Sequence, residues 1–99
     1  MAGIARQGDS VATGHLCDTT TTLDTPGQST VFVDGILVAC QGDLTVTHDY
    51  KVGDACVPHV ASISGATSTV KIGGISIAKL GDACDAGSIT SASSTVFIG

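Results

Sequence analysis

Hydrophobic and polar residues alternate along this chain in short stretches, and no stretch keeps the spacing of three and four that marks an amphipathic helix. Three stretches are rich in β-branched residues and nearly identical: TVFV, TVKI and TVFI, at residues 30–33, 69–72 and 95–98. Each follows a serine and leads within two residues to a glycine, the residue that best permits a tight turn. The pattern predicts an all-β chain of short strands and tight turns.

A second short strand is predicted after two of these turns, at residues 36–40 and 75–79. Both copies then reach a Gly-Asp pair, and the interval from the serine to that glycine is 13 residues each time, from Ser29 to Gly42 and from Ser68 to Gly81. Two strands joined by a glycine turn at a fixed spacing predict a β-hairpin.

The two ends of the chain supply the halves of a third hairpin. Residues 3–9 (GIARQGD) align with the second strands that end in CQGD and KLGD, whereas residues 94–99 (STVFIG) match a first strand. We therefore expect the termini to pair and to close a small, conical, single domain of residues 1–99 with approximate three-fold symmetry. The alternative interpretation is an ordinary β-sandwich in which the similar segments occur by chance. It is less favoured, because the two equal intervals and the complementary ends of the chain all indicate the same repeat. In this scheme Asp9, Asp43 and Asp82 are copies of one turn-capping residue and not catalytic acids.

Composition narrows the classes of function. The net charge is −5 and only four Lys and Arg are present, so nucleic acid is not an expected partner. The longest apolar run, residues 36–40, is far shorter than the ~20 residues that span a bilayer. The first residues form no secretory signal, so we expect the chain to fold in a reducing cytoplasm.

Histidine and cysteine residues are the candidates for a metal site. The three histidines lie in the segments between hairpins, and Cys84 lies two residues after the third Gly-Asp pair. Three imidazoles and one thiolate at the three-fold axis would form a tetrahedral Zn²⁺ site that stabilises a thin core. The simpler interpretation is that the histidines are exposed and bind nothing, and that the cysteines are small buried hydrophobic residues. Two disulfides are a further possibility for four cysteines, although the reducing compartment favours metal. The candidate ligands are His15, His48, His59 and Cys84, with Cys17 and Cys56 as rivals to Cys84.

Hairpins of the form S-T-V-F-V-x-G that lead to Gly-Asp, three around an axis, resemble the PAAR-repeat proteins over essentially the whole chain. The four residues that name the family fall at 3–6 (GIAR), 37–40 (LVAC) and 76–79 (SIAK), where no proline is present and arginine occurs once. The resemblance implies a cone with one structural zinc ion near its point, held by three histidines and one cysteine. Carried over, these are His15, His48, His59 and Cys84.

The resemblance also implies a mechanical role without catalysis. Such cones cap and sharpen a trimeric β-helical spike, VgrG-like or a phage central spike, in type VI secretion systems and contractile phage tails. One monomer would sit on each trimer, would contact the target membrane transiently, and would form no stable homo-oligomer. The expected locations are a virion tail tip or the bacterial cytoplasm before delivery, and no toxin domain is expected.

The sequence leaves two other classes of function open. A small zinc-dependent hydrolase would need a vacant metal position and a base such as Asp49 or Asp85. A secreted, disulfide-stapled binding module would need oxidised cysteines.

Overall fold

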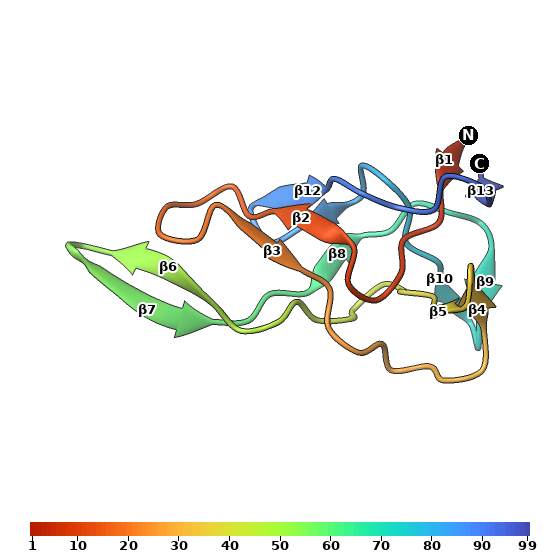
Figure 1. The fold of residues 1–99 in the computed structure, drawn as a ribbon, viewed down its shortest axis with the longest axis horizontal. Helices are drawn as coiled ribbons and strands as arrows, with labels where there is room; N and C mark the ends of the chain where they lie inside the picture. The colour runs from red at the N-terminus through yellow and green to blue at the C-terminus, as the bar shows by residue number, and fades with distance from the viewer.

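The computed structural model describes all 99 residues and confirms the all-β prediction, with thirteen short strands and no helix. The molecule measures 41 × 24 × 22 Å and narrows from a wide end that holds both termini to a narrow end formed by β6 and β7 (Figure 1). No helix long and apolar enough to cross a membrane occurs in it. The strands are β1 (Ala2–Gly3), β2 (Ser10–Ala12), β3 (Thr20–Thr22), β4 (Phe32–Val33), β5 (Ile36–Leu37), β6 (His48–Val52), β7 (Ala55–His59), β8 (Ile63–Gly65), β9 (Lys71–Ile72), β10 (Ile75–Ser76), β11 (Ala83–Cys84), β12 (Gly87–Ile89) and β13 (Phe97–Ile98).

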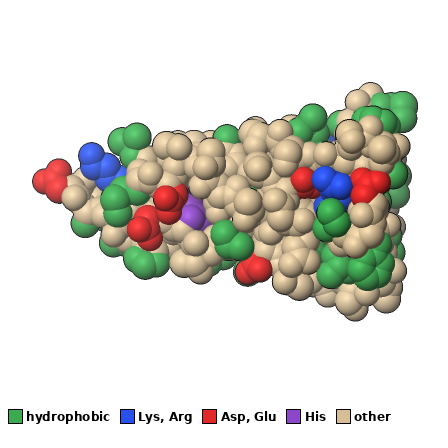
Figure 2. Space-filling view, in the orientation of Figure 1, with side chains coloured by type: hydrophobic (Ala, Val, Ile, Leu, Met, Phe, Trp, Pro, Cys, Tyr) green, Lys and Arg blue, Asp and Glu red, His purple; other side chains and the backbone are tan.

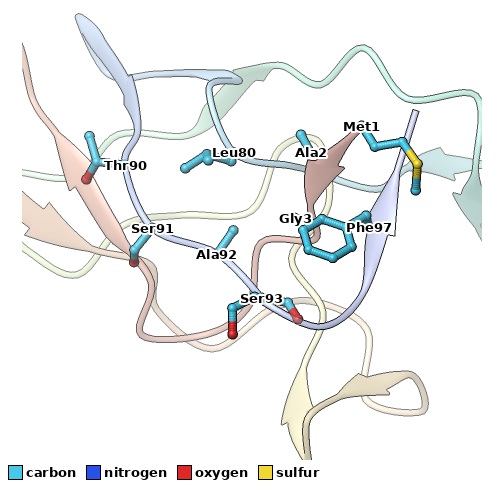
Figure 3. Close-up of a pocket in the computed structure, with 10 residues that line it drawn as sticks. Met1, Ala2, Gly3, Leu80, Thr90, Ser91, Ala92, Ser93 and Phe97 are labelled. Atoms are coloured by element: carbon cyan, nitrogen blue, oxygen red, sulfur yellow. The ribbon is translucent and has the colours of Figure 1, made fainter.

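Three two-stranded hairpins surround the wide end, as the repeat predicts. Strands β4 and β5 form the first and β9 and β10 the second, each antiparallel. The third joins the two ends of the chain, with Ala2 opposite Ile98 in the β1–β13 pair. Beside this seam, Leu80 and Phe97 line a shallow groove that Met1 borders (Figure 3).

A triangle of backbone hydrogen bonds joins the three hairpins at the axis. The N–H of Ala5 donates to the carbonyl of Ala78 at 3.0 Å, that of Ala39 to Ala5 at 3.0 Å, and that of Ala78 to Ala39 at 2.9 Å. All three alanines are fully buried, so the axis is filled by methyl groups and peptide units. The predicted three-fold ring is therefore present in the backbone itself.

The Gly-Asp pairs have the structural role that the sequence indicates. In each of the three copies the aspartate carboxylate accepts a hydrogen bond from the backbone N–H three residues earlier, at 2.7–2.8 Å. This contact fixes the turn that leads out of the second strand. The pairs are Arg6 with Asp9, Cys40 with Asp43, and Lys79 with Asp82.

The core is built in layers of three equivalent residues along the axis. A layer near the hairpins contains Ile4, Val38 and Ile77. Beyond the alanines lie two further buried layers, of Leu23, Ile63 and Ile89 and then of Val11, Thr45 and Cys84. Each member of the last layer follows a Gly-Asp aspartate by two residues.

Toward the narrow end the three repeats no longer have the same structure. A five-stranded sheet in the order β3-β2-β12-β11-β8 surrounds the last core layers. Strands β6 and β7 extend beyond it as a separate antiparallel hairpin with His48 opposite His59 (Figure 1).

Candidate metal centre

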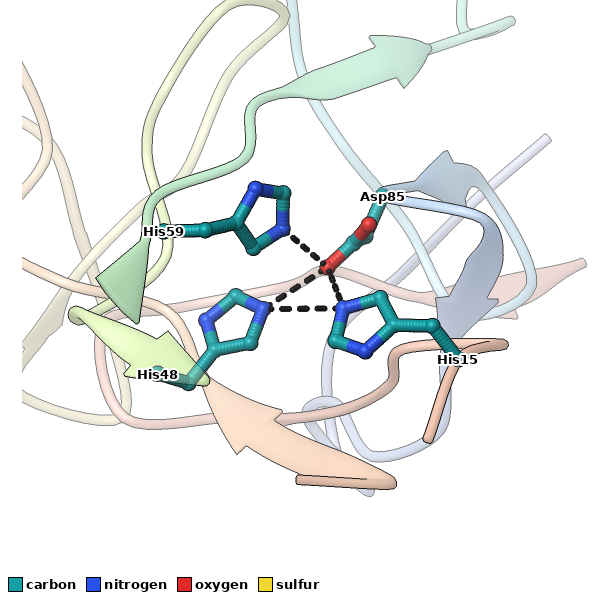
Figure 4. Close-up of side chains that lie close together, drawn as sticks. All are labelled: His15, His48, His59 and Asp85. Carbon is teal, nitrogen blue, oxygen red and sulfur yellow. Dashed lines mark hydrogen bonds and ion pairs between the residues drawn. The ribbon is translucent and has the colours of Figure 1, made fainter. Parts of the chain in front are cut away.

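Four segments bring three histidines and one aspartate together where the β6–β7 hairpin leaves the body (Figure 4). His48 begins β6 and His59 ends β7, and their cross-strand pairing sets the ring centroids 4.6 Å apart. His15 comes from the loop between β2 and β3. Asp85 lies in the two-residue turn between β11 and β12.

Close backbone packing places the third histidine beside the aspartate. The N–H of Ala86 donates to the carbonyl of Thr13 at 2.9 Å, which joins the β2–β3 loop to the turn after β11. Gly14 follows in a left-handed conformation, and a Cβ there would lie only 2.3 Å from the Ala86 carbonyl oxygen. Glycine at this position therefore permits the approach that brings His15 to Asp85.

The ligand atoms converge on one small volume. Asp85 Oδ2 lies 2.8 Å from Nε2 of His15, 2.8 Å from Nε2 of His48 and 3.1 Å from Nε2 of His59. The Nε2 atoms of His15 and His48 are 3.3 Å apart, and all four ligand atoms lie within 4.8 Å of one another. The His48 side chain is 3% exposed and that of Asp85 is 7% exposed, whereas His15 and His59 reach solvent at 17% and 25%.

Hydrogen bonds on the far side of two rings indicate where the imidazole protons lie. His48 Nδ1 is 2.9 Å from the carbonyl of Val46, and His15 Nδ1 is 3.1 Å from the carbonyl of Leu16. A carbonyl only accepts, so each Nδ1 carries a proton, and in a neutral ring the Nε2 lone pair then points inward.

Two inward lone pairs and a carboxylate repel one another unless a cation lies between them. Ligands about 2.0 Å from a tetrahedral metal ion lie roughly 3.3 Å apart, close to the separation of the two Nε2 atoms. The residues therefore fit a metal ion bound by three imidazoles and one carboxylate.

The acid–base properties of the metal-free cluster show that it favours positive charge. Burial raises the pKa of Asp85, but hydrogen bonds from His59, His48 and His15, which need a proton on each Nε2, outweigh it and lower that pKa to about 2. Burial lowers the pKa of His15, but contacts with the Leu16 carbonyl and with Asp85 outweigh it and raise the pKa. The group therefore favours positive charge beside a fixed carboxylate, supplied either by a proton or by a metal ion.

The structure places Asp85, and not the predicted Cys84, beside the three imidazoles. Cys84 is fully buried in the core layer with Val11 and Thr45, at the last position of β11, whereas Asp85 begins the turn that follows and contacts the imidazoles. Burial and the nearby Asp85 carboxylate raise the pKa of the Cys84 thiol to about 11, which keeps it protonated. Asp85 adopts a left-handed conformation, with φ of 57°, that aspartate tolerates better than most residues. The sequence offered only the position of this aspartate directly after Cys84, and there it was considered as a base and not as a ligand.

The other two cysteines considered as ligands form a disulfide. Cys17 bonds to Cys56, against the expectation of reduced thiols. The reason is local: the β2–β3 loop pairs with β6 through a bridge between Cys17 and Tyr50, and this brings it beside Cys56 on the neighbouring strand. Asp49 remains outside the group of ligand atoms.

Comparison with known families gives one match. The family model described as the PAAR motif matches residues 13–88, which include all four residues of the cluster. A search of curated proteins finds no match to the chain.

Proposed function

Since the chain belongs to the PAAR motif family of spike-related proteins, we propose that it caps a trimeric β-helical spike of a contractile injection machine. In this role it sharpens the spike and helps it to pierce the envelope of a target cell. The protein is structural, with one zinc ion near its point. The observation that carries the proposal is the backbone triangle of Ala5, Ala39 and Ala78, which gives a single chain the symmetry of a trimer.

The wide end offers a surface for such a partner. Large apolar side chains of the three hairpins are exposed there, between 37% and 55%, and Figure 2 shows hydrophobic atoms gathered around this end. Exposed apolar clusters on a small domain mark interaction surfaces. The basal apolar surface consists of Val31, Phe32, Ile36, Val70, Ile75, Val96 and Phe97.

The narrow end fits the mechanical part of the proposal. Zinc bound by His15, His48, His59 and Asp85 would cross-link segments that are far apart in sequence where the apolar core ends. When bound, the ion supplies strong coordinate bonds that stabilise the folded form. Four protein ligands complete a tetrahedral shell and leave no position for a substrate, which favours a structural ion over a hydrolytic one.

The test is binding to a purified trimeric β-helical spike encoded beside this chain. We expect one monomer per trimer by light scattering of the complex. Val70→Asp places a charge on the basal apolar surface and should weaken binding by tenfold or more, about 1.4 kcal/mol or greater. Val52→Asp is the matched control, because Val52 is similarly exposed (49% against 45%) but lies at the narrow end in β6.

Binding at one monomer per trimer that only Val70→Asp weakens supports the cap. A stable homotrimer of this chain, or equal loss of binding in both variants, contradicts it.

A further inference from the structure

The disulfide lies across the candidate metal centre. Cys17 is two residues from His15 in the β2–β3 loop, and Cys56 is three residues from His59 in β7. The bond therefore ties the segment that carries one ligand to the hairpin that carries two others. The two cysteines are 39 residues apart in sequence, and their Cα atoms are 5.9 Å apart.

Apart from the contacts of the His15 ring with His48, Tyr50 and His59, few other contacts hold these two segments together. The N–H of Asp18 donates to the carbonyl of Asp49 at 3.1 Å, and the N–H of Asp49 donates to the Asp18 carboxylate at 2.7 Å in an exposed position. Of the residues in β6 and β7 only His48 is buried. Segments with few buried apolar contacts open locally at low free-energy cost, so the disulfide is a main restraint on opening.

The disulfide is also open to exchange. Cys56 is exposed and Cys17 is half-buried, whereas the two free cysteines, Cys40 and Cys84, are buried. A change of redox conditions therefore acts on this pair alone. Cys17 has a φ of 76°, a left-handed conformation that costs a non-glycine residue free energy.

We propose that the Cys17–Cys56 pair is a redox clasp on the metal centre: the disulfide retains the ion, and the dithiol allows it to leave. This rests on the metal centre of the proposed function. The pair would be reduced in the cytoplasm and would close in an oxidising compartment. Closure proceeds by exchange with a second disulfide, either glutathione disulfide or the active-site disulfide of a thiol–disulfide oxidoreductase. Two thiols lose two protons and two electrons as the new S–S bond forms, and the oxidant's disulfide takes up both and becomes two thiols.

The experiment measures the rate at which zinc leaves the full chain. Zinc-loaded protein is treated with glutathione disulfide or with a phosphine reductant, and release is followed with a chromogenic chelator in excess. We expect release at least about tenfold slower from the oxidised form, because opening of the β6–β7 hairpin is restrained. Hydrogen exchange of residues 48–59 should become faster on reduction.

Two variants separate the possible causes. Cys17→Ser with Cys56→Ser should release zinc quickly under both conditions. Cys40→Ala, which removes a buried thiol outside the pair, should keep the dependence on redox state. Because the unmodified chain is compared with itself in two states, the test does not depend on the double variant folding.

The outcomes distinguish this proposal from the one on which it rests. If the chain binds no zinc in either state, the metal centre itself fails. If zinc binds but leaves at one rate in both states, even though the disulfide raises the melting temperature, the bond is only a stabilising link and the clasp is overturned. Slower release after reduction also overturns it, because the freed thiols would then be acting as ligands.

Discussion

Replacing Cys84 by alanine tests which residue completes the metal centre. The Cys84 side chain is fully buried between core residues, and its neighbour Asp85 is the one that faces the three imidazoles. Removing the sulfur deletes one buried heavy atom and leaves a small cavity. In other proteins, changes of this size cost about 1 kcal/mol of unfolding free energy. In a domain of this length such a loss lowers the melting temperature by about 4–8 °C.

We expect Cys84→Ala to lower the unfolding free energy by the same amount with and without zinc. Since the Cys84 thiol contacts the core and not the ligand cluster, Cys84→Ala should bind as much zinc per chain as the unmodified protein. Denaturation of zinc-loaded and metal-free samples gives the two free energies, and atomic absorption gives the stoichiometry. His48→Ala is the positive control, because it removes one of the proposed ligands, the imidazole 2.8 Å from Asp85.

The reasoning would be refuted by zinc loss in Cys84→Ala that equals the loss in His48→Ala. Such a result would show that the thiol turns toward the metal ion and that the core layer rearranges when zinc binds.

Two further predictions concern the same end of the molecule. The lowered pKa of Asp85 means that its contribution to the stability of the metal-free protein is present above its ordinary value of 3.8 and is lost as the pH falls through about 2. Between pH 3.8 and about 2, the unfolding free energy of the metal-free protein should therefore fall by about 2 kcal/mol more than that of Asp85→Asn. Urea titrations at several pH values measure this difference. An equal dependence of unfolding free energy on pH in the two proteins would contradict the role given to Asp85. Gly14→Ala should destabilise the chain by at least about 2 kcal/mol more than Gly8→Ala and should weaken zinc binding. Both glycines have a positive φ, but of the two only Gly14 would bring a Cβ against backbone atoms. Equal losses in thermal unfolding would show that the Gly14 loop can move away from the Ala86 carbonyl.

The wide end of the fold could be predicted from the sequence because three copies of one pattern constrain one another. The intervals beginning at Ser29 and Ser68 fix two hairpins, and the ends of the chain complete the third. Repetition also identified Asp9, Asp43 and Asp82 as turn residues, which their hydrogen bonds confirm.

The narrow end was harder to predict because its contacts occur once and not three times. That the three histidines would converge could be foreseen, but the choice between Cys84 and Asp85 depends on the residue at which β11 ends and its turn begins. The sequence does not fix that boundary to within one residue. The Cys17–Cys56 bond depends on a loop that pairs with β6, and neither length nor composition specifies that pairing.

The alanine triangle has a consequence for how the chain reaches its folded state. Ala5 donates to Ala78, and Ala2 pairs with Ile98, 96 residues along the chain. The first strand therefore has no partner until nearly all the residues that follow it have been synthesised. Contacts so distant in sequence make folding slow, because much chain entropy is lost before they form.

Each bond of the triangle joins two of the three hairpins, so the ring closes only when all three hairpins have formed. An N-terminal fragment would keep an unpaired strand edge, the kind of surface through which incomplete chains aggregate. The ring that gives the folded protein its symmetry thus makes assembly nearly all-or-none.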